Sequence, residues 1–166
     1  MLLFKKGLER ALLVLICALL VIMVCLMLWQ VFTRYVLATP ALFTEETLRF
    51  SMIWMALLGT AYCFGTRKHL SLELLVHISP PWAQKTLGVF NGLVTIAFAG
   101  FVMLMGGWHA SQSAMSQLSP IMQLSMGLIY LAVPVSAGLI IALQAINTIL
   151  IATGRISPVD LPEEAV

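Results

Sequence analysis

Long runs of uncharged, mostly apolar residues divide this chain, and charged residues mark the boundaries between them. The first run covers residues 11–33, between Arg10 and Arg34. A helix needs about 20 residues to cross the roughly 30 Å hydrocarbon layer of a membrane, so this run predicts a first transmembrane helix. A basic start before an apolar run also occurs in signal peptides. Because this run exceeds the usual signal core and no clear cleavage site follows, we expect it to be retained.

A second run begins after a short charged segment. Residues 50–66 are uncharged, and Thr44, Glu45 and Glu46 precede them. Threonine is a common helix N-cap, and acidic residues in a first turn interact favourably with the helix dipole. The sequence therefore predicts a second span over 44–66, capped by Thr44, with Arg49 one turn inside it.

The longest uncharged run, residues 86–154, is too long for one helix. A polar stretch at 106–113, followed by Pro120, divides it into a third span at 86–107 and a fourth at 122–151. Pro134 lies within the fourth span and predicts a kink, because proline lacks the N–H that an α-helix uses. Residues 153–166 carry two prolines and three acidic residues and are expected to form a solvated tail.

The segment between the second and third spans, residues 69–79, is too short and too polar to cross a membrane. Four of its apolar residues gather on one face of a helical wheel, largely opposite His69, Glu73 and His77; they are Leu70, Leu74, Leu75 and Ile78. This pattern predicts an amphipathic helix that lies in the plane of the membrane interface.

Composition excludes several other classes of protein. Hydrophobic residues make up 61% of the chain and charged residues only 10%, whereas soluble domains carry about 25% charged residues. A soluble domain and a disordered chain are therefore excluded. The basic residues are scattered in ones and twos, so no nucleic-acid partner is expected.

Lysine and arginine are unequally divided between the two sides of the predicted spans. With the N-terminus in the cytoplasm, seven of these residues lie inside and only Arg34 lies outside, with Arg49 in the second span. Cytoplasmic loops are enriched in Lys and Arg, so both termini are expected in the cytoplasm. The predicted fold is an all-α integral membrane protein. Residues 1–152 form one domain of four transmembrane helices plus the in-plane amphipathic helix.

Arg34, Glu45, Glu46 and Arg49 form the only mixed-charge cluster near a membrane face. Glu45 precedes Arg49 by four residues and Glu46 by three, so both acids are expected to reach Arg49 on a helix. One interpretation is a proton or ion path, and the other is a structural ion-pair cluster that joins the first two spans or grips a partner. We favour the second, because a relay normally needs a charged residue at mid-membrane and no predicted span has one there.

No catalytic, cofactor or metal site is expected. A haem with two imidazole ligands needs both at similar depth on facing helices, whereas His69 and His77 are predicted near the inner face and His109 near the outer face. The three cysteines all lie within apolar runs, where we expect packing residues rather than disulfides or metal ligands.

Four segments, taken together, resemble the small membrane subunit (DctQ-like) of tripartite ATP-independent periplasmic, or TRAP, transporters. The matching segments are Phe32-Thr33-Arg34-Tyr35-Val36, Thr44-Glu45-Glu46-Thr47-Leu48-Arg49, Gly59, and Arg67-Lys68-His69-Leu70-Ser71-Leu72-Glu73. Their order and spacing agree with an R-Y pair, an E-E-x-x-R helix start, a glycine within a span and a basic–His–acidic segment.

The resemblance implies an accessory subunit in the bacterial inner membrane that does not itself transport. In that family a periplasmic binding protein captures an organic acid, and a large membrane subunit moves it by an elevator-like motion driven by a sodium gradient. The small subunit packs against the static scaffold of the large one and helps to dock the binding protein. Membrane lipids are further expected partners, sodium coupling is expected in the large subunit, and sialic acid is favoured over C4-dicarboxylates.

By matching position, the resemblance assigns structural roles to eight residues and a catalytic role to none. Its candidates for partner contacts are Arg34, Tyr35, Glu45, Glu46, Arg49 and Gly59, while His69 and Glu73 mark the inner amphipathic helix. One alternative is an autonomous small transporter with Glu45 or Glu46 as the coupling acid. A less favoured alternative is a haem-bearing membrane anchor of a redox enzyme.

Overall fold

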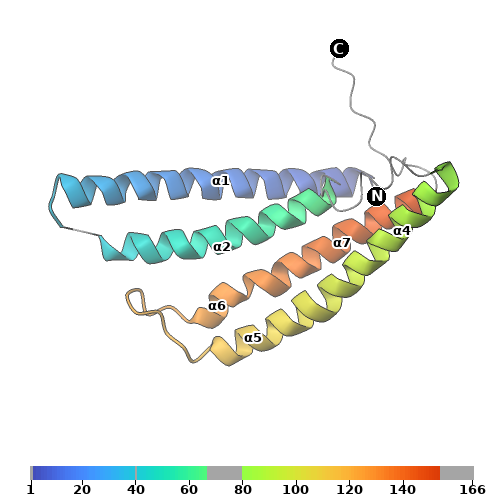
Figure 1. Ribbon diagram of the computed structural model, residues 1–166. Helices are drawn as coiled ribbons and strands as arrows, with labels where there is room; N and C mark the ends of the chain where they lie inside the picture. Colours follow the sequence, from blue (N-terminus) through green and yellow to red (C-terminus); the bar gives the residue numbers. More distant parts are fainter. Residues whose placement is uncertain (1, 40, 67–79, 154–166) are drawn as a thin grey trace, which may run out of the picture.

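The computed structural model describes residues 2–39, 41–66 and 80–153, which are almost entirely helical (Figure 1). The elements are α1 (Leu2–Tyr35), α2 (Leu42–Gly65), α4 (Pro81–Phe98), the π-helix η1 (Ala99–Gly106), α5 (Gly107–Ala114), α6 (Met126–Tyr130) and α7 (Ala132–Ala152). The segments α4, η1 and α5 follow one another without a break and form one long helical rod.

Four stretches of this helical chain are long and apolar enough to cross a membrane. They are Lys5–Tyr35, Leu42–Gly65, Ala83–Ala114 and Met126–Ala152. The prediction of an all-α protein with four membrane spans is confirmed. The predicted in-plane helix at 69–79, with His69 and Glu73, and residues 154–166 of the predicted tail lie outside the described residues.

The helices pack in the order α1, α2, α7, and then the rod of α4, η1 and α5. Two small core clusters lie along α7: Leu12 and Leu58 pack on Leu143, and Ala61 and Ala99 pack on Ile140. In the membrane window of α7, 44% of the residues are buried inside the chain, compared with 6% for α1. Helix α7 is therefore the centre of the fold, and α1 leaves most of its apolar surface uncovered.

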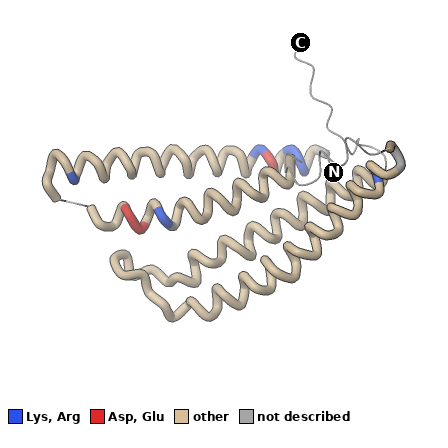
Figure 2. The backbone as a smooth tube through the Cα atoms, in the orientation of Figure 1, with Lys and Arg blue, Asp and Glu red and all other residues tan. Residues whose placement is uncertain are grey.

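The charged residues that the structure describes lie toward the two ends of the bundle, and its middle is uncharged (Figure 2). We call the end that contains Lys5 and Gly65 the Lys5 end, and the opposite end, which contains Arg34 and Glu46, the Glu46 end. This arrangement follows from the cost of placing an ionised side chain in hydrocarbon.

The third span is longer than predicted, because the chain stays helical through the polar stretch 106–113 to Ala114. The stretch packs against the next span instead of forming a loop. Ser111 is buried and its hydroxyl donates a hydrogen bond of 2.8 Å to the carbonyl of Gly127. A Cβ on Gly107 would meet the side chain of Val133 at 2.8 Å, which shows how closely the two helices approach.

The fourth span begins at Met126 and not at the predicted residue 122, because residues 117–126 fold into a separate hairpin described below. The span is interrupted where proline predicted a kink. Pro134 has no N–H to donate to the carbonyl of Tyr130, and α6 ends at that residue. The α-helix resumes as α7 after Leu131.

The prediction that Thr44 caps the second span is wrong. Helix α2 begins at Leu42, after Ala41 in the N-cap position, where no side chain caps the helix. Thr44 is fully buried, and its hydroxyl donates to the carbonyl of Ala41 at 2.6 Å instead of accepting from a backbone N–H. Leu42 and Phe43, which precede Thr44 in the first turn, are apolar and exposed, so the apolar span begins two residues earlier than predicted.

Candidate functional site

Residues 117–126 form a short hairpin between α5 and α6, which we call the 117–126 hairpin. The N–H of Ser119 donates to the carbonyl of Leu124 at 2.8 Å, and the N–H of Met126 donates to the carbonyl of Gln117 at 2.8 Å. Gln123 adopts a positive φ of 55° in the turn. The hairpin places several backbone N–H groups close together, facing α2.

Glu46, in the second turn of α2, accepts three hydrogen bonds from this hairpin. Its Oε2 accepts from the hydroxyl of Ser119 at 2.9 Å and from the N–H of Met122 at 2.9 Å, and its Oε1 accepts from the N–H of Ile121 at 3.1 Å. The residue is only 6% exposed. Hydrogen bonds to an ionised acceptor are roughly twice as strong as neutral ones, so Glu46 fixes the hairpin to α2.

The predicted charge cluster is therefore divided. Glu45 and Arg49 form the expected ion pair at 3.7 Å, and both side chains are largely exposed. Glu46 bonds the hairpin instead of joining that ion pair, which corrects the expectation that both acids reach Arg49. Arg34 and Tyr35 are exposed at the end of α1, and in the described part of the chain Arg34 forms no ion pair.

Gly59, in the middle of α2, has no packing role within the described chain. A Cβ built on it meets no atom within 4 Å, so the space beside it is open. Its candidate role in a partner contact is compatible with this geometry and remains a prediction.

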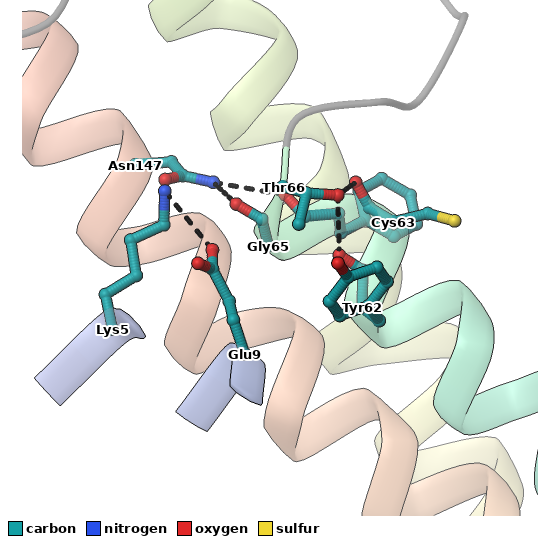
Figure 3. A network of polar contacts seen from close by, with 8 residues as sticks. Lys5, Glu9, Tyr62, Cys63, Gly65, Thr66 and Asn147 are labelled. Carbon is teal, nitrogen blue, oxygen red and sulfur yellow. Dashed lines mark hydrogen bonds and ion pairs between the residues drawn. The ribbon is translucent and has the colours of Figure 1, made fainter. Parts of the chain in front are cut away.

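A second polar cluster lies at the Lys5 end and joins three helices (Figure 3). Asn147 of α7 is 1% exposed, and its Nδ2 donates to the carbonyls of Phe64 and Gly65, both at 3.1 Å. The last carbonyls of a helix have no partner inside it, so Asn147 satisfies two groups that α2 leaves open. The Oδ1 of Asn147 is buried and accepts no hydrogen bond from the residues described.

Helix α1 reaches the same cluster through a largely buried ion pair. The Nζ of Lys5 lies 3.4 Å from Oε1 of Glu9, and the two side chains are only 11% and 17% exposed. A Cβ on Gly65 would lie 3.3 Å from that same oxygen of Glu9 and 3.0 Å from Leu143. Glycine at position 65 therefore allows α1, α2 and α7 to meet closely.

Glu9 and Asn147 were not among the residues predicted from the sequence, and Lys5 contributed only to the predicted orientation of the chain. Two signals were available: Lys5 and Glu9 are four residues apart, and Asn147 is an amide within an apolar span, where it is expected to bond another helix. The remaining polar candidates do not converge. In the parts of the chain described, no three His, Cys, Asp or Glu side chains gather as metal ligands, and His109 and the cysteines are exposed.

Replacing Asn147 with leucine is expected to destabilise the isolated protein by about 1–3 kcal/mol, because the carbonyls of Phe64 and Gly65, the second of them buried, lose this donor. The measurement is the midpoint of thermal unfolding in detergent micelles, followed by tryptophan fluorescence. Asn91→Leu in α4 is the matched control, since Asn91 is only half-buried. Equal losses for the two variants would contradict a specific role of Asn147 at the end of α2.

Comparison with known proteins connects this geometry to one family. Residues 23–154 match the family described as "Tripartite ATP-independent periplasmic transporters, DctQ component". A TRAP transporter small permease protein of Haemophilus influenzae is 31% identical over 81% of this chain and 82% of its own length.

Two further relatives carry substrate names and match shorter segments. The sialic acid TRAP transporter small permease protein SiaQ of Vibrio cholerae is 27% identical over 54% of this chain and 52% of its own length. The C4-dicarboxylate TRAP transporter small permease protein DctQ of Rhodobacter capsulatus is 30% identical over 52% of this chain and 39% of its own length.

Proposed function

This chain belongs to the DctQ family of TRAP transporter components, and we propose that it is a rigid accessory subunit that supports a separate, larger transport subunit. Its family makes it a transporter component, not an enzyme, and a multi-pass protein of the bacterial inner membrane. The partners, the coupling ion and the cargo are part of the proposal.

The proposal rests on the carboxylates of the described residues, each of which already has a partner within the chain. Within the described residues, Glu9 pairs with Lys5, Glu46 bonds the 117–126 hairpin, and Glu45 is exposed beside Arg49. A transport site for an ion or an anionic cargo normally uses an ionisable group near mid-membrane. The described residues leave no carboxylate there, which favours a supporting role over autonomous transport.

The packing is consistent with a static subunit. Glu46 holds one end of α2 to the 117–126 hairpin, and Asn147 of α7 holds the other end. Helix α1 packs on α2 and exposes a long apolar face, including Leu28, Trp29 and Phe32. We infer that the large membrane subunit covers part of such a face, while the seam between α2 and α7 stays unchanged during transport.

The orientation follows from the charges at the two ends. Lys5, Lys6, Arg10 and Lys85 lie toward the Lys5 end (Figure 2), and basic residues favour the cytoplasm. We therefore propose that the Glu46 end faces the periplasm. Arg34, Tyr35 and the Glu45–Arg49 pair are exposed there and are our candidates for contact with the periplasmic binding protein or the large subunit.

We propose an organic acid as the cargo and a sodium gradient, used by the large subunit, as the driving force. The names of the relatives include a sialic acid system and a C4-dicarboxylate system, and both cargoes are carboxylates. Sialic acid is the first substrate to test, and a C4-dicarboxylate is the second.

Co-purification and reconstitution test the proposal. The tagged chain is expressed with the large membrane subunit of its own system and is expected to recover it from detergent extracts. Proteoliposomes containing both subunits and supplied with the binding protein should take up substrate when a sodium gradient is applied. Sodium-driven uptake by vesicles containing this chain alone would overturn the proposal.

Arg49→Ala is expected to reduce recovery of the complex more than His109→Ala does, while leaving the isolated chain almost as stable as before. The exposed pair with Glu45 should contribute only about 0.2–1 kcal/mol to that stability. Recovery is measured by quantifying the large subunit bound to equal amounts of tagged chain. The same yield of complex for the two variants would remove Arg49 from the partner contact.

A further inference from the structure

We propose that the 117–126 hairpin is a membrane anchor that inserts apolar side chains into the boundary between lipid headgroups and acyl chains at the Glu46 end. The proposed partner is the lipid surface itself. This inference goes beyond the proposed function, since it requires only that the four spans cross a membrane.

The hairpin presents apolar side chains and no charge. Leu118, Ile121 and Leu124 are 58%, 43% and 41% exposed, and the chain carries no charged residue between Lys85 and Arg155. The adjoining helices α5 and α6 also expose apolar side chains, among them Trp108 and Leu128. A connection in water would be expected to carry charged residues, whereas apolar residues next to a membrane span suit the interface.

The hairpin also lies closer to the middle of the bundle than the connection between α1 and α2 (Figure 1). Its turn contacts Glu46 and Thr47, and the hydroxyl of Thr47 donates to Sδ of Met122 at 3.3 Å. At 1.5 Å per residue, Glu46 lies about 6 Å along the helix axis from Leu42, where α2 begins. In Figure 1 the connection between α1 and α2 extends further from the middle of the bundle than the hairpin does. The hairpin therefore lies at the depth of the helix ends and not in the aqueous space beyond them.

Non-helical backbone at this depth needs internal hydrogen-bond acceptors, because lipid offers few. Glu46 supplies the acceptors for the N–H groups of Ile121 and Met122. The N–H of Leu124 donates to the hydroxyl of Ser119 at 3.3 Å. The buried carboxylate thus acts as a positioning group, because it satisfies the turn and leaves the apolar side chains to face lipid.

Depth-dependent fluorescence quenching tests this anchor in the full chain. The exposed Cys17, Cys25 and Cys63 are replaced by serine, Leu118→Cys is added, and the new thiol carries an environment-sensitive fluorophore in phosphatidylcholine nanodiscs. Lipids spin-labelled near the headgroup are expected to quench it several-fold more than aqueous iodide does. Thr39→Cys, in the connection between α1 and α2, is the matched control and should show the opposite order.

Two further measurements separate lipid from other occupants. Adding Glu46→Ala should raise iodide quenching at position 118 several-fold without changing it at position 39. Strong iodide quenching of Leu118→Cys in the chain that keeps Glu46 would overturn the anchor. Loss of quenching by spin-labelled lipid once the large subunit is bound would assign this surface to a protein and would also overturn it. Neither result would bear on whether the chain supports transport.

Discussion

Glu46→Ala is expected to release the 117–126 hairpin from α2 and to lower the midpoint of thermal unfolding by about 5 °C or more. The alanine removes the acceptor of three hydrogen bonds at once, from Ser119, Ile121 and Met122. Two of the freed donors are backbone N–H groups, for which the described residues show no side-chain acceptor other than Glu46. Protease cleavage within the hairpin, followed in detergent by mass spectrometry, should become several-fold faster.

Glu45→Ala is the matched control, because it removes the same chemical group from the adjacent residue. Glu45 is exposed and, among the described residues, pairs only with Arg49, at 3.7 Å, so its loss should leave both the midpoint and the cleavage rate almost unchanged. Glu46→Gln should lie between the two, since an amide retains one acceptor oxygen but turns an N–H₂ group toward another donor. If Glu45→Ala and Glu46→Ala gave the same cleavage rate, Glu46 would not hold the hairpin.

The membrane spans were predictable because a span depends on the length of an uncharged, apolar run along the sequence and not on contacts between distant residues. A run of uncharged residues between charges marks a span, whatever the helices pack against. This is why the run from Arg10 to Arg34 lies within α1, which ends one residue after Arg34. The third span was predicted too short because residues 106–113 are polar by composition, which suggested a loop. In the structure they stay helical, and the hydroxyl of Ser111 donates a hydrogen bond to the carbonyl of Gly127.

The candidate site was only partly predictable, because several of its hydrogen bonds join residues that are distant in sequence. The Glu45–Arg49 pair follows from a spacing of four residues and was found. Glu46 lies three residues before Arg49, so the same helical spacing predicted a pair with Arg49. Its hydrogen-bond partners instead lie more than 70 residues away, in a hairpin that no local pattern predicts. Asn147 likewise acts on the end of α2, 82 residues earlier. A single sequence gives the residue types of such pairs but not their partners.

The contact between α5 and α6 depends on the lack of a side chain at Gly127. A Cβ built there would lie 2.7 Å from the backbone oxygen of Ser111 and 2.7 Å from Sδ of Met115. The methionine side chain can rotate away, but the oxygen belongs to the backbone of α5 and cannot move alone. Relief therefore requires the two helices to separate, which also weakens the 2.8 Å hydrogen bond from Ser111 to Gly127.

Gly127→Ala is accordingly expected to destabilise the isolated protein by about 1–3 kcal/mol, as overpacking in a close contact does. The midpoint of thermal unfolding in detergent micelles measures it. Gly138→Ala in α7 is the matched control, because a Cβ there meets no atom within 4 Å and alanine favours a helix over glycine by about 0.5–1 kcal/mol. The two substitutions should thus shift the midpoint in opposite directions. Equal or higher stability of Gly127→Ala would show that α5 and α6 are not packed this closely, and the base of the 117–126 hairpin would then lack its fixed support.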